Sequence, residues 1–261
     1  MVARMTVAEV LAVLAAGFAA GAINAVVGSG TLVTFPVLLA TGLPPVTASV
    51  SNTLGLVPGN VSGAVGYRRE LAGQRGLVLR LLPASALGAL TGAVLLLTLP
   101  AAAFEAVVPV LVGLAVVLVA VQPLLTRRLA ARHAEPGTTP RGWRLAGLVA
   151  GAYATGSYGG YFAASQGVLQ VGVFGLLLAE PLQRLNALKN VLSAAVNAVA
   201  AVAYVVVATD RVDWAAAGLV AGGSVVGGVV GARYGRRLPA TALRTAIVVL
   251  GCVAIGVLVT R

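Results

Sequence analysis

Charged side chains, and acidic ones above all, are scarce in this chain. Its 261 residues include 7 Asp and Glu against 18 Lys and Arg, and only 10% of the residues are charged. Soluble domains are typically about 25% charged. The low charge, together with 59% hydrophobic residues and a mean hydropathy of +0.99, excludes an ordinary soluble domain and indicates a membrane protein.

Cysteine and histidine are almost absent. The chain has one of each, Cys252 in an apolar run and His133 in a polar loop. A single cysteine cannot form an intrachain disulfide, and a zinc site would need several such ligands. The sequence also has no nucleotide-binding loop and no nucleophile–base pair. We therefore expect no enzyme, no metal and no cofactor.

The excess of positive charge does not predict a nucleic-acid partner. The net charge is +11, but the arginines gather in short loops between apolar runs. Membrane proteins fix their orientation with basic loops of this kind on the cytoplasmic side. The predicted partner is the lipid bilayer, in a multi-pass arrangement.

Ten apolar runs, several interrupted by glycine or proline, make up most of the sequence. A straight transmembrane helix needs about 20 apolar residues, and some of the runs are too short for that. The runs predict an all-α polytopic membrane protein with about eight transmembrane helices plus broken or re-entrant segments. They span residues 7–27, 32–43, 45–67, 77–99, 104–125, 145–154, 161–178, 182–207, 214–233 and 239–259.

A polar linker at residues 126–144 divides the chain into two halves, residues 1–125 and 145–261. A shift of 137 positions places Asn52 of the first half on Lys189 of the second. The same order of apolar runs in both halves indicates an internal membrane repeat. The shift also aligns Pro44 with Pro181, Asn60 with Asn197 and Tyr67 with Tyr204.

The arginine distribution predicts the orientation of the two repeats. If the basic loops lie in the cytoplasm, the run 45–67 crosses inward and its counterpart 182–207 crosses outward. The repeats are then inverted, with the linker in the cytoplasm and both termini outside. Inverted repeats with glycine-broken helices are typical of transporters that bind substrate near the midplane of the bilayer.

Lys189 is the only lysine of the chain and lies inside an apolar run that contains no Asp or Glu. A charge at membrane depth is expensive and usually faces a cavity or a ligand. With no acidic partner in its own helix, its countercharge could be an anionic substrate. The alternative is that the side chain snorkels to the nearer membrane interface.

Two glycine-rich stretches, residues 28–31 and 156–160, predict breaks in the membrane helices. A half-helix that starts after such a break directs free N–H groups and a positive dipole end at a ligand, which suits an anion. Asn24 lies four residues before the first break. The alternative is close helix packing, and we assign that role to the glycines at positions 88, 92, 223, 227 and 231.

Amide side chains recur in the third run of each half. Asn52 and Asn190 lie at or beside the repeat-related position of Lys189, which favours a binding role. Asn60 and Asn197 lie two turns further on and serve equally well as hydrogen-bonding partners between helices.

At these residues the chain resembles the sulfite exporter TauE/SafE family of membrane transporters. The first half carries Gly-Ala-Ile-Asn-Ala-Val-Val-Gly-Ser-Gly-Thr-Leu at residues 21–32, and the second carries Asn-Ala-Leu-Lys at 186–189 and Gly-Gly-Val-Val-Gly-Ala-Arg at 227–233. The resemblance covers nearly the whole chain. It implies transport of sulfur-containing anions, such as sulfite or organosulfonates, across the bacterial inner membrane.

We therefore expect a transporter of a small anion that works by alternating access at a midplane site between inverted repeats. A non-transporting membrane subunit, a transporter of another small solute and, more weakly, a membrane enzyme remain as alternatives. The coupling ion and the assembly into homo-oligomers stay open. The predicted substrate-binding residues are Asn24, Gly28, Ser29, Gly30, Thr31, Asn52, Lys189 and Asn190.

Overall fold

The computed structural model describes residues 5–130, 140–235, 245 and 248–249. These residues form nine α-helices and one 3-10 turn, the latter at Thr209–Arg211. The helices are α1 (Val7–Val26), α2 (Thr31–Ala40), α3 (Pro45–Gly66), α4 (Arg75–Thr98), α5 (Ala101–Ala130), α6 (Trp143–Tyr161), α7 (Gln166–Leu177), α8 (Leu182–Val207) and α9 (Trp214–Tyr234).

The expected all-α membrane fold is confirmed. Within the described residues, α1, α4, α5, α8 and α9 are long and apolar enough to cross a bilayer. Two further helices, α3 and α6, have 22 and 19 residues and are less apolar. The short helices α2 and α7, with 10 and 12 residues, are the half-helices that the broken runs predicted.

Local sequence explains where several helices begin. Thr6 and Glu9 form a capping box at the start of α1, and the Asp213 side chain accepts a hydrogen bond from the Ala216 N–H at the start of α9. Such caps satisfy N–H groups that have no partner within the helix. Pro44 and Pro181 occupy the N-cap positions of α3 and α8, as expected for repeat-related residues.

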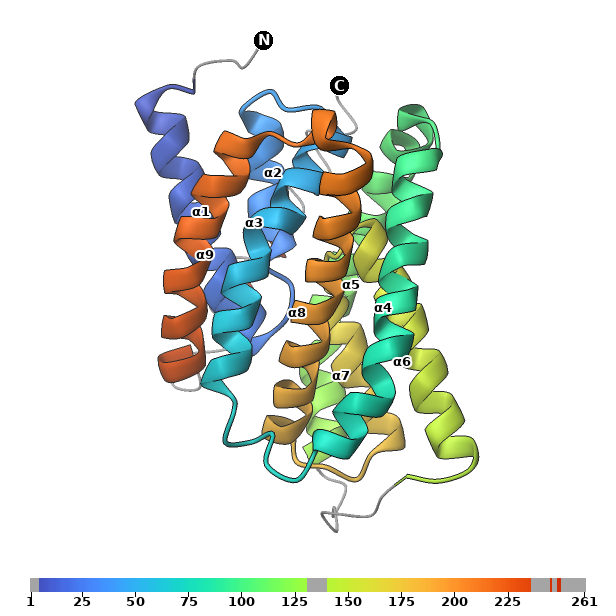
Figure 1. Cartoon of the computed structure of the whole chain (residues 1–261). Helices are drawn as coiled ribbons and strands as arrows, with labels where there is room; N and C mark the ends of the chain where they lie inside the picture. The colour runs from blue at the N-terminus through green and yellow to red at the C-terminus, as the bar shows by residue number, and fades with distance from the viewer. Residues whose placement is uncertain (1–4, 131–139, 236–244, 246–247, 250–261) are drawn as a thin grey trace.

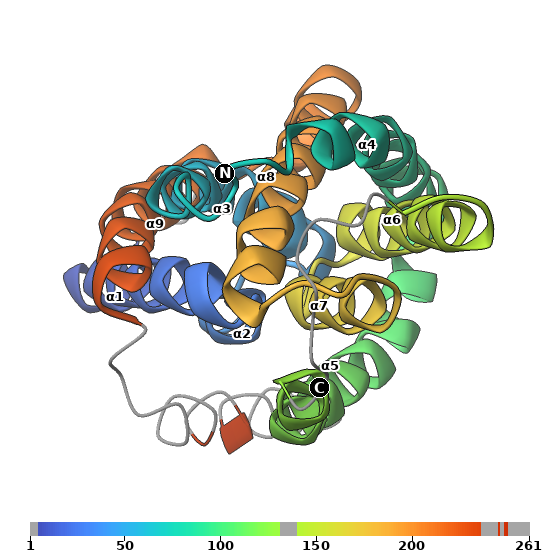
Figure 2. The same cartoon turned by 90° about the horizontal axis from the view of Figure 1, so that it is seen from below.

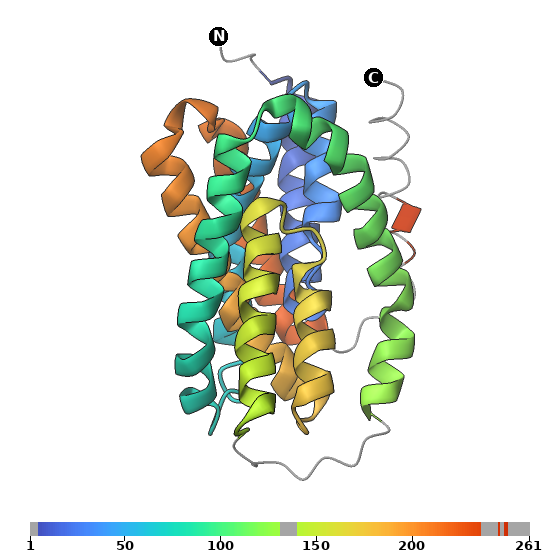
Figure 3. The same cartoon turned by 90° about the vertical axis from the view of Figure 1, so that its right-hand side faces the viewer.

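The helices α1–α4 and α6–α9 follow the same order but run in opposite directions (Figures 1 and 3). The helix α6 starts at the end of the molecule where α5 ends, whereas α1 starts at the opposite end. The last helix of the first half is longer than expected, because α5 continues beyond position 125 to Ala130. The linker residues 131–139, most of the apolar run 239–259 and both termini lie outside the described residues.

Each repeat contributes one helix to the other. The helix α4 packs mainly on α6, and α9 packs mainly on α1 and α3. Two bundles result, bundle A (α1, α2, α3 and α9) and bundle B (α4, α6, α7 and α8), while α5 lies along the outside (Figure 2). The bundles meet chiefly where α3 lies beside α8. The predicted site between the repeats would therefore lie between the two bundles.

Glycines allow the exchanged helices to approach closely, as the sequence predicted for positions 88, 92, 223, 227 and 231. A Cβ added to Gly92 would lie 2.1 Å from the Ser157 carbonyl oxygen, and one added to Gly227 would lie 1.9 Å from that of Phe18. In both interfaces a glycine lies against a main-chain carbonyl group of the facing helix. The two interfaces are therefore built alike, which supports the internal repeat.

We expect Gly227→Ala to destabilise the protein and Gly218→Ala on the same helix to leave it unchanged or more stable. The first change overpacks a helix interface, which typically costs about 1–3 kcal/mol. A Cβ at Gly218 meets nothing within 4 Å, so only the helix-favouring effect of alanine remains. Thermal unfolding of the two variants in the same detergent measures the difference, and equal stabilities would contradict the packing role.

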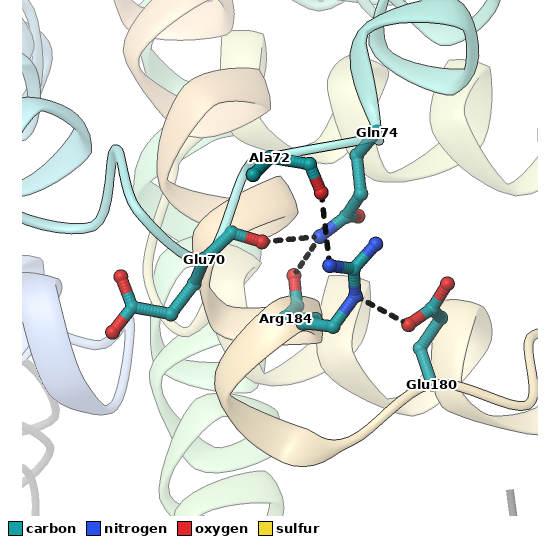
Figure 4. A network of polar contacts seen from close by, with 5 residues as sticks. All are labelled: Glu70, Ala72, Gln74, Glu180 and Arg184. Atoms are coloured by element: carbon teal, nitrogen blue, oxygen red, sulfur yellow. Dashed lines mark hydrogen bonds and ion pairs between the residues drawn. The ribbon is translucent and has the colours of Figure 1, made fainter. Parts of the chain in front are cut away.

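The connection from α3 to α4, which joins the two bundles, is held against α8 (Figure 4). The Arg184 guanidinium donates to the Ala72 carbonyl oxygen at 2.9 Å and pairs with Glu180 at 2.6 Å. The Gln74 side-chain amide donates to the backbone carbonyl oxygens of Glu70 and Arg184, at 2.9 and 3.2 Å. These contacts fix the later part of the connection to bundle B.

Candidate functional site

The two helix breaks meet in the interior of the molecule. The first lies between the end of α1 at Val26 and the start of α2 at Thr31, where the sequence predicted it. The predicted position of the second break, at residues 156–160, was wrong. The helix α6 continues through residues 156–160 to Tyr161, and the break follows at residues 162–165. The glycines of that stretch serve helix packing instead: a Cβ at Gly156 would lie 2.5 Å from the Ser85 carbonyl oxygen.

The two breaks are in direct contact through one glycine from each, Gly28 and Gly167. The Gly167 N–H, in the first turn of α7, donates to the Gly28 carbonyl oxygen at 3.1 Å. A Cβ on Gly28 would lie 2.5 Å from the Gly167 Cα, and one on Gly167 would lie 2.6 Å from the Gly28 Cα. Gly28 also has a φ of +90°, which favours glycine. A side chain at either position would push the two bundles apart.

Asn24 organises the first break from the last turns of α1. Its side-chain oxygen accepts the Gly30 N–H at 2.6 Å, and its amide nitrogen donates to the Asn60 side-chain oxygen on α3 at 3.1 Å. One side chain therefore links α1, the turn and α3 within bundle A.

Lys189 lies on α8 of bundle B and reaches across to bundle A. Its side chain is fully buried, and its ammonium donates to the Asn24 carbonyl oxygen at 2.9 Å and to the Ala25 carbonyl oxygen at 3.5 Å. Asn190 also donates to the Ala25 carbonyl oxygen, at 3.1 Å. The last carbonyls of a helix carry a partial negative charge. The end of α1 thus supplies part of the missing countercharge, and the alternative that Lys189 snorkels to an interface is wrong.

Asn52 holds the start of α2 against α3. Its amide nitrogen donates to the Thr31 hydroxyl at 3.2 Å, and its side-chain oxygen accepts a short hydrogen bond from the Thr34 hydroxyl. Ser29 is also buried, and its hydroxyl has no hydrogen-bond partner among the described residues. Both polar atoms of the Asn52 side chain therefore have a partner within bundle A, whereas the Ser29 hydroxyl has none among the described residues.

A small polar cavity lies where the breaks meet, with a volume of about 10 Å³. That is barely enough for one water molecule. Three predicted residues line it, whereas Ser29, Gly30, Asn52, Lys189 and Asn190 do not. The alkyl chain of Lys189 nevertheless approaches it, since a Cβ on Gly167 would lie 2.9 Å from the Lys189 Cδ. The cavity is lined by Asn24, Gly28, Thr31, Asn60, Ala163, Gln166, Gly167, Ser193 and Asn197.

Gln166, Gly167 and Ser193 were not predicted as site residues from the sequence, and the roles of Asn60 and Asn197 were left open. Gln166 and Gly167 open α7 directly after the second break, so they were missed because that break was misplaced. Ser193 lies one turn after Lys189 on α8. Helical spacing from Lys189 places Ser193 and, one turn further, Asn197 on the same face of α8.

Several buried polar atoms around this cavity have no hydrogen-bond partner among the described residues. They include the amide nitrogens of Gln166 and Asn60 and the side-chain oxygen of Asn197. An unsatisfied buried polar group costs about 1–3 kcal/mol. The two nitrogens are neutral donors that can bind the oxygens of a small anion, and they come from different bundles.

Comparison with known proteins fits this architecture. Residues 13–258 match the family described as Sulfite exporter TauE/SafE. The chain belongs to that family. The match covers most of the sequence and includes both repeats, and with the five apolar spans it makes this TauE/SafE protein a multi-pass membrane protein.

Two relatives carry names that agree with the family. A "Probable membrane transporter protein" of Haemophilus influenzae is 26% identical over 246 residues, which is 93% of this chain and 91% of the relative. The "Probable membrane transporter protein YfcA" of Escherichia coli K12 is 27% identical over 224 residues, 84% of this chain and 76% of the relative. No solved structure matches the chain significantly.

Proposed function

We propose that this TauE/SafE protein is a secondary transporter or facilitator that carries a small anion, a sulfur oxyanion or organosulfonate, across the cytoplasmic membrane of a bacterium. The observation that carries the proposal is the polar cavity between the bundles. Its free amide donors, Gln166 and Asn60, come from opposite repeats, and the buried cation Lys189 lies beside it. The names of the family and of its relatives agree with transport.

The swapped bundles support transport by alternating access. A sulfur oxyanion has at least three oxygens around sulfur and cannot fit a space that holds one water, so the bundles must separate before the anion binds. Separation would break the bonds from Gly167 to Gly28 and from Lys189 to the end of α1, because both cross between the bundles. The ammonium of Lys189 would then be free to meet the anion.

One observation favours the alternative of a membrane subunit that does not transport. Lys189 already has protein partners at the end of α1, so in this conformation it acts as a tie between helices. In that case the amide cavity would need no ligand, and the tie alone would explain the buried charge.

Flux measurements separate the two functions. Purified protein in vesicles should show saturable flux of sulfite, thiosulfate or a sulfonate under an imposed ion or voltage gradient, with no flux of a neutral solute of similar size. Protein-free vesicles and a Lys189→Met variant serve as controls. Flux indistinguishable from that of the protein-free vesicles for every anion would support the subunit.

We expect Gln166→Leu to weaken anion binding and Gln166→Glu to weaken it further. The leucine removes a free donor, and a hydrogen bond to a charged partner is worth about 1.5–3 kcal/mol, or roughly a tenfold to hundredfold loss of affinity. The glutamate adds repulsion. The concentration of anion at half-maximal flux measures the effect, with Gln122→Leu on α5 as a matched buried control outside the cavity. Equal constants in all three variants would remove Gln166 from the site.

A further inference from the structure

A second hollow lies away from the amide cavity, at the end of the molecule where α3 and α9 terminate. Its volume is about 580 Å³, and α3 and α9 of bundle A both contribute to it. The hollow lies between helices of different repeats, so residues distant in sequence meet there. Its walls are formed by Ser62, Val65, Gly66, Arg68, Arg69, Glu70, Val229, Ala232 and Arg233.

Three arginines line this groove. Arg68 and Arg69 follow the end of α3, and Arg233 lies in the last turn of α9. All three are exposed, and within the described part of the chain none forms an ion pair with a carboxylate. Glu70 contributes the one carboxylate of the described lining. The groove therefore carries a net positive charge and suits an anion.

The other wall of the groove is apolar and open to the side. Val65 and Val229 are 54% and 51% exposed, and each lies about one turn before the arginines of its helix. Helix ends of a membrane protein typically lie at the level of the lipid headgroups, so exposed valines one turn before those ends would face the acyl chains. Charge at headgroup depth next to an exposed apolar wall matches the shape of a lipid rather than of a free ion.

Local roles account for only part of this arrangement. Arg68 donates to the Val65 carbonyl oxygen at 3.3 Å, and the Arg233 guanidinium lies over the Tyr234 ring at 5.7 Å. Both arginines also favour the negative ends of their helices. Such contacts use one donor of Arg68 and one face of Arg233, whereas a guanidinium has five N–H donors. Among the described residues, most of the donors of the three side chains therefore have no protein partner and can serve a ligand.

We propose that the groove between the ends of α3 and α9 binds the phosphate headgroup of an anionic membrane lipid, with an acyl chain along Val65 and Val229. Basic pockets between membrane helices are suited to phosphate headgroups, and each arginine near the surface contributes to attraction. The site is separate from the transport cavity, and the proposal does not depend on the transport function.

Native mass spectrometry of the purified full chain tests the site. Protein is titrated with phosphatidylglycerol or, in parallel, phosphatidylcholine. The triple variant Arg68→Gln, Arg69→Gln, Arg233→Gln should lose the tight phosphatidylglycerol adduct, with affinity lowered about a hundredfold. The matched control Arg75→Gln, Arg80→Gln, Arg144→Gln removes the same charge from α4 and α6 and should keep it. Val65→Asn should also weaken the adduct.

Three results would overturn the proposal. Equal loss in both triple variants would show a general attraction of the basic face rather than a site. Equal binding of phosphatidylcholine would remove the role of the charge. If inorganic phosphate alone bound the groove as tightly as the lipid, and Val65→Asn had no effect, the ligand would be a free anion and the lipid assignment would be wrong.

Discussion

Replacing Lys189 by methionine is expected to abolish anion flux and leave the protein folded. Methionine fills similar space without a charge, and removing a fully buried ammonium relieves its desolvation. The Ala25 carbonyl oxygen keeps its bond from Asn190. Stability should therefore be unchanged or higher. Loss of one partner of a buried charge pair costs about 2–5 kcal/mol, so affinity should fall roughly 30-fold or more.

The other two substitutions at this position separate charge from shape. Lys189→Arg should recover only part of the flux, since a planar guanidinium differs from a compact ammonium and Gly167 leaves little room beside the alkyl chain. Lys189→Glu should be the least active, because it repels the anion. Flux and thermal stability are measured together for all three variants. Full flux in Lys189→Met would show that the lysine only ties the helices together.

Gly167→Ala is expected to remove transport and to destabilise the fold. Its Cβ would lie 2.6 Å from the Gly28 Cα and 2.9 Å from the Lys189 Cδ, and the first of these contacts is with backbone. Overpacking of this kind costs about 1–3 kcal/mol. The bundles would be wedged apart at the breaks. Flux in vesicles and thermal unfolding in detergent are both measured. A protein whose bundles are separated but still folded would lose the flux and keep most of its thermal stability.

Matched glycines separate crowding from backbone strain. Gly113→Ala changes a helical glycine with nothing within 4 Å and should gain stability. Gly28 and Gly42 have φ values of +90° and +86°, but only Gly28 is crowded. Gly28→Ala should therefore lower the stability more than Gly42→Ala, which carries only the backbone strain of about 1–2 kcal/mol.

Normal flux in Gly167→Ala would contradict the close approach of the breaks.

Much of the fold could be predicted from the sequence because bilayer physics constrains it. Apolar run lengths, arginine loops and repeat-related residues such as Asn52 and Lys189 indicated the membrane class, the repeat and its inversion. The first break was placed well because Gly28 combines positive φ with contact to another backbone. The exchange of α4 and α9 between the repeats was not predicted, since sequence periodicity does not say which helix a glycine face meets.

The site was predicted only in part, for two physical reasons. Glycine serves both breaks and helix packing, and residues 156–160 show the second use. The true second break at residues 162–165 contains no glycine, and it adopts positive φ at Ala163 and Ser165 instead. Gln166 was not predicted as a site residue, because it directly follows this misplaced break. Lys189 was predicted to bind an anionic ligand, and the structure buries it fully against α1. Its partners there are 165 and 164 residues away in sequence and gave no local signal.

Substrate protection of a cysteine in the cavity tests most directly whether the anion binds between the bundles. In a Cys252→Ala background, Ser193→Cys places a thiol at the cavity lining, and Ser157→Cys places one on α6 outside it. We expect a small thiol reagent to label position 193 slowly, and saturating anion to slow that labelling at least about tenfold while labelling at 157 stays the same. If the protein transports the anion but labelling at position 193 is unchanged by it, the cavity between the breaks is not the binding site.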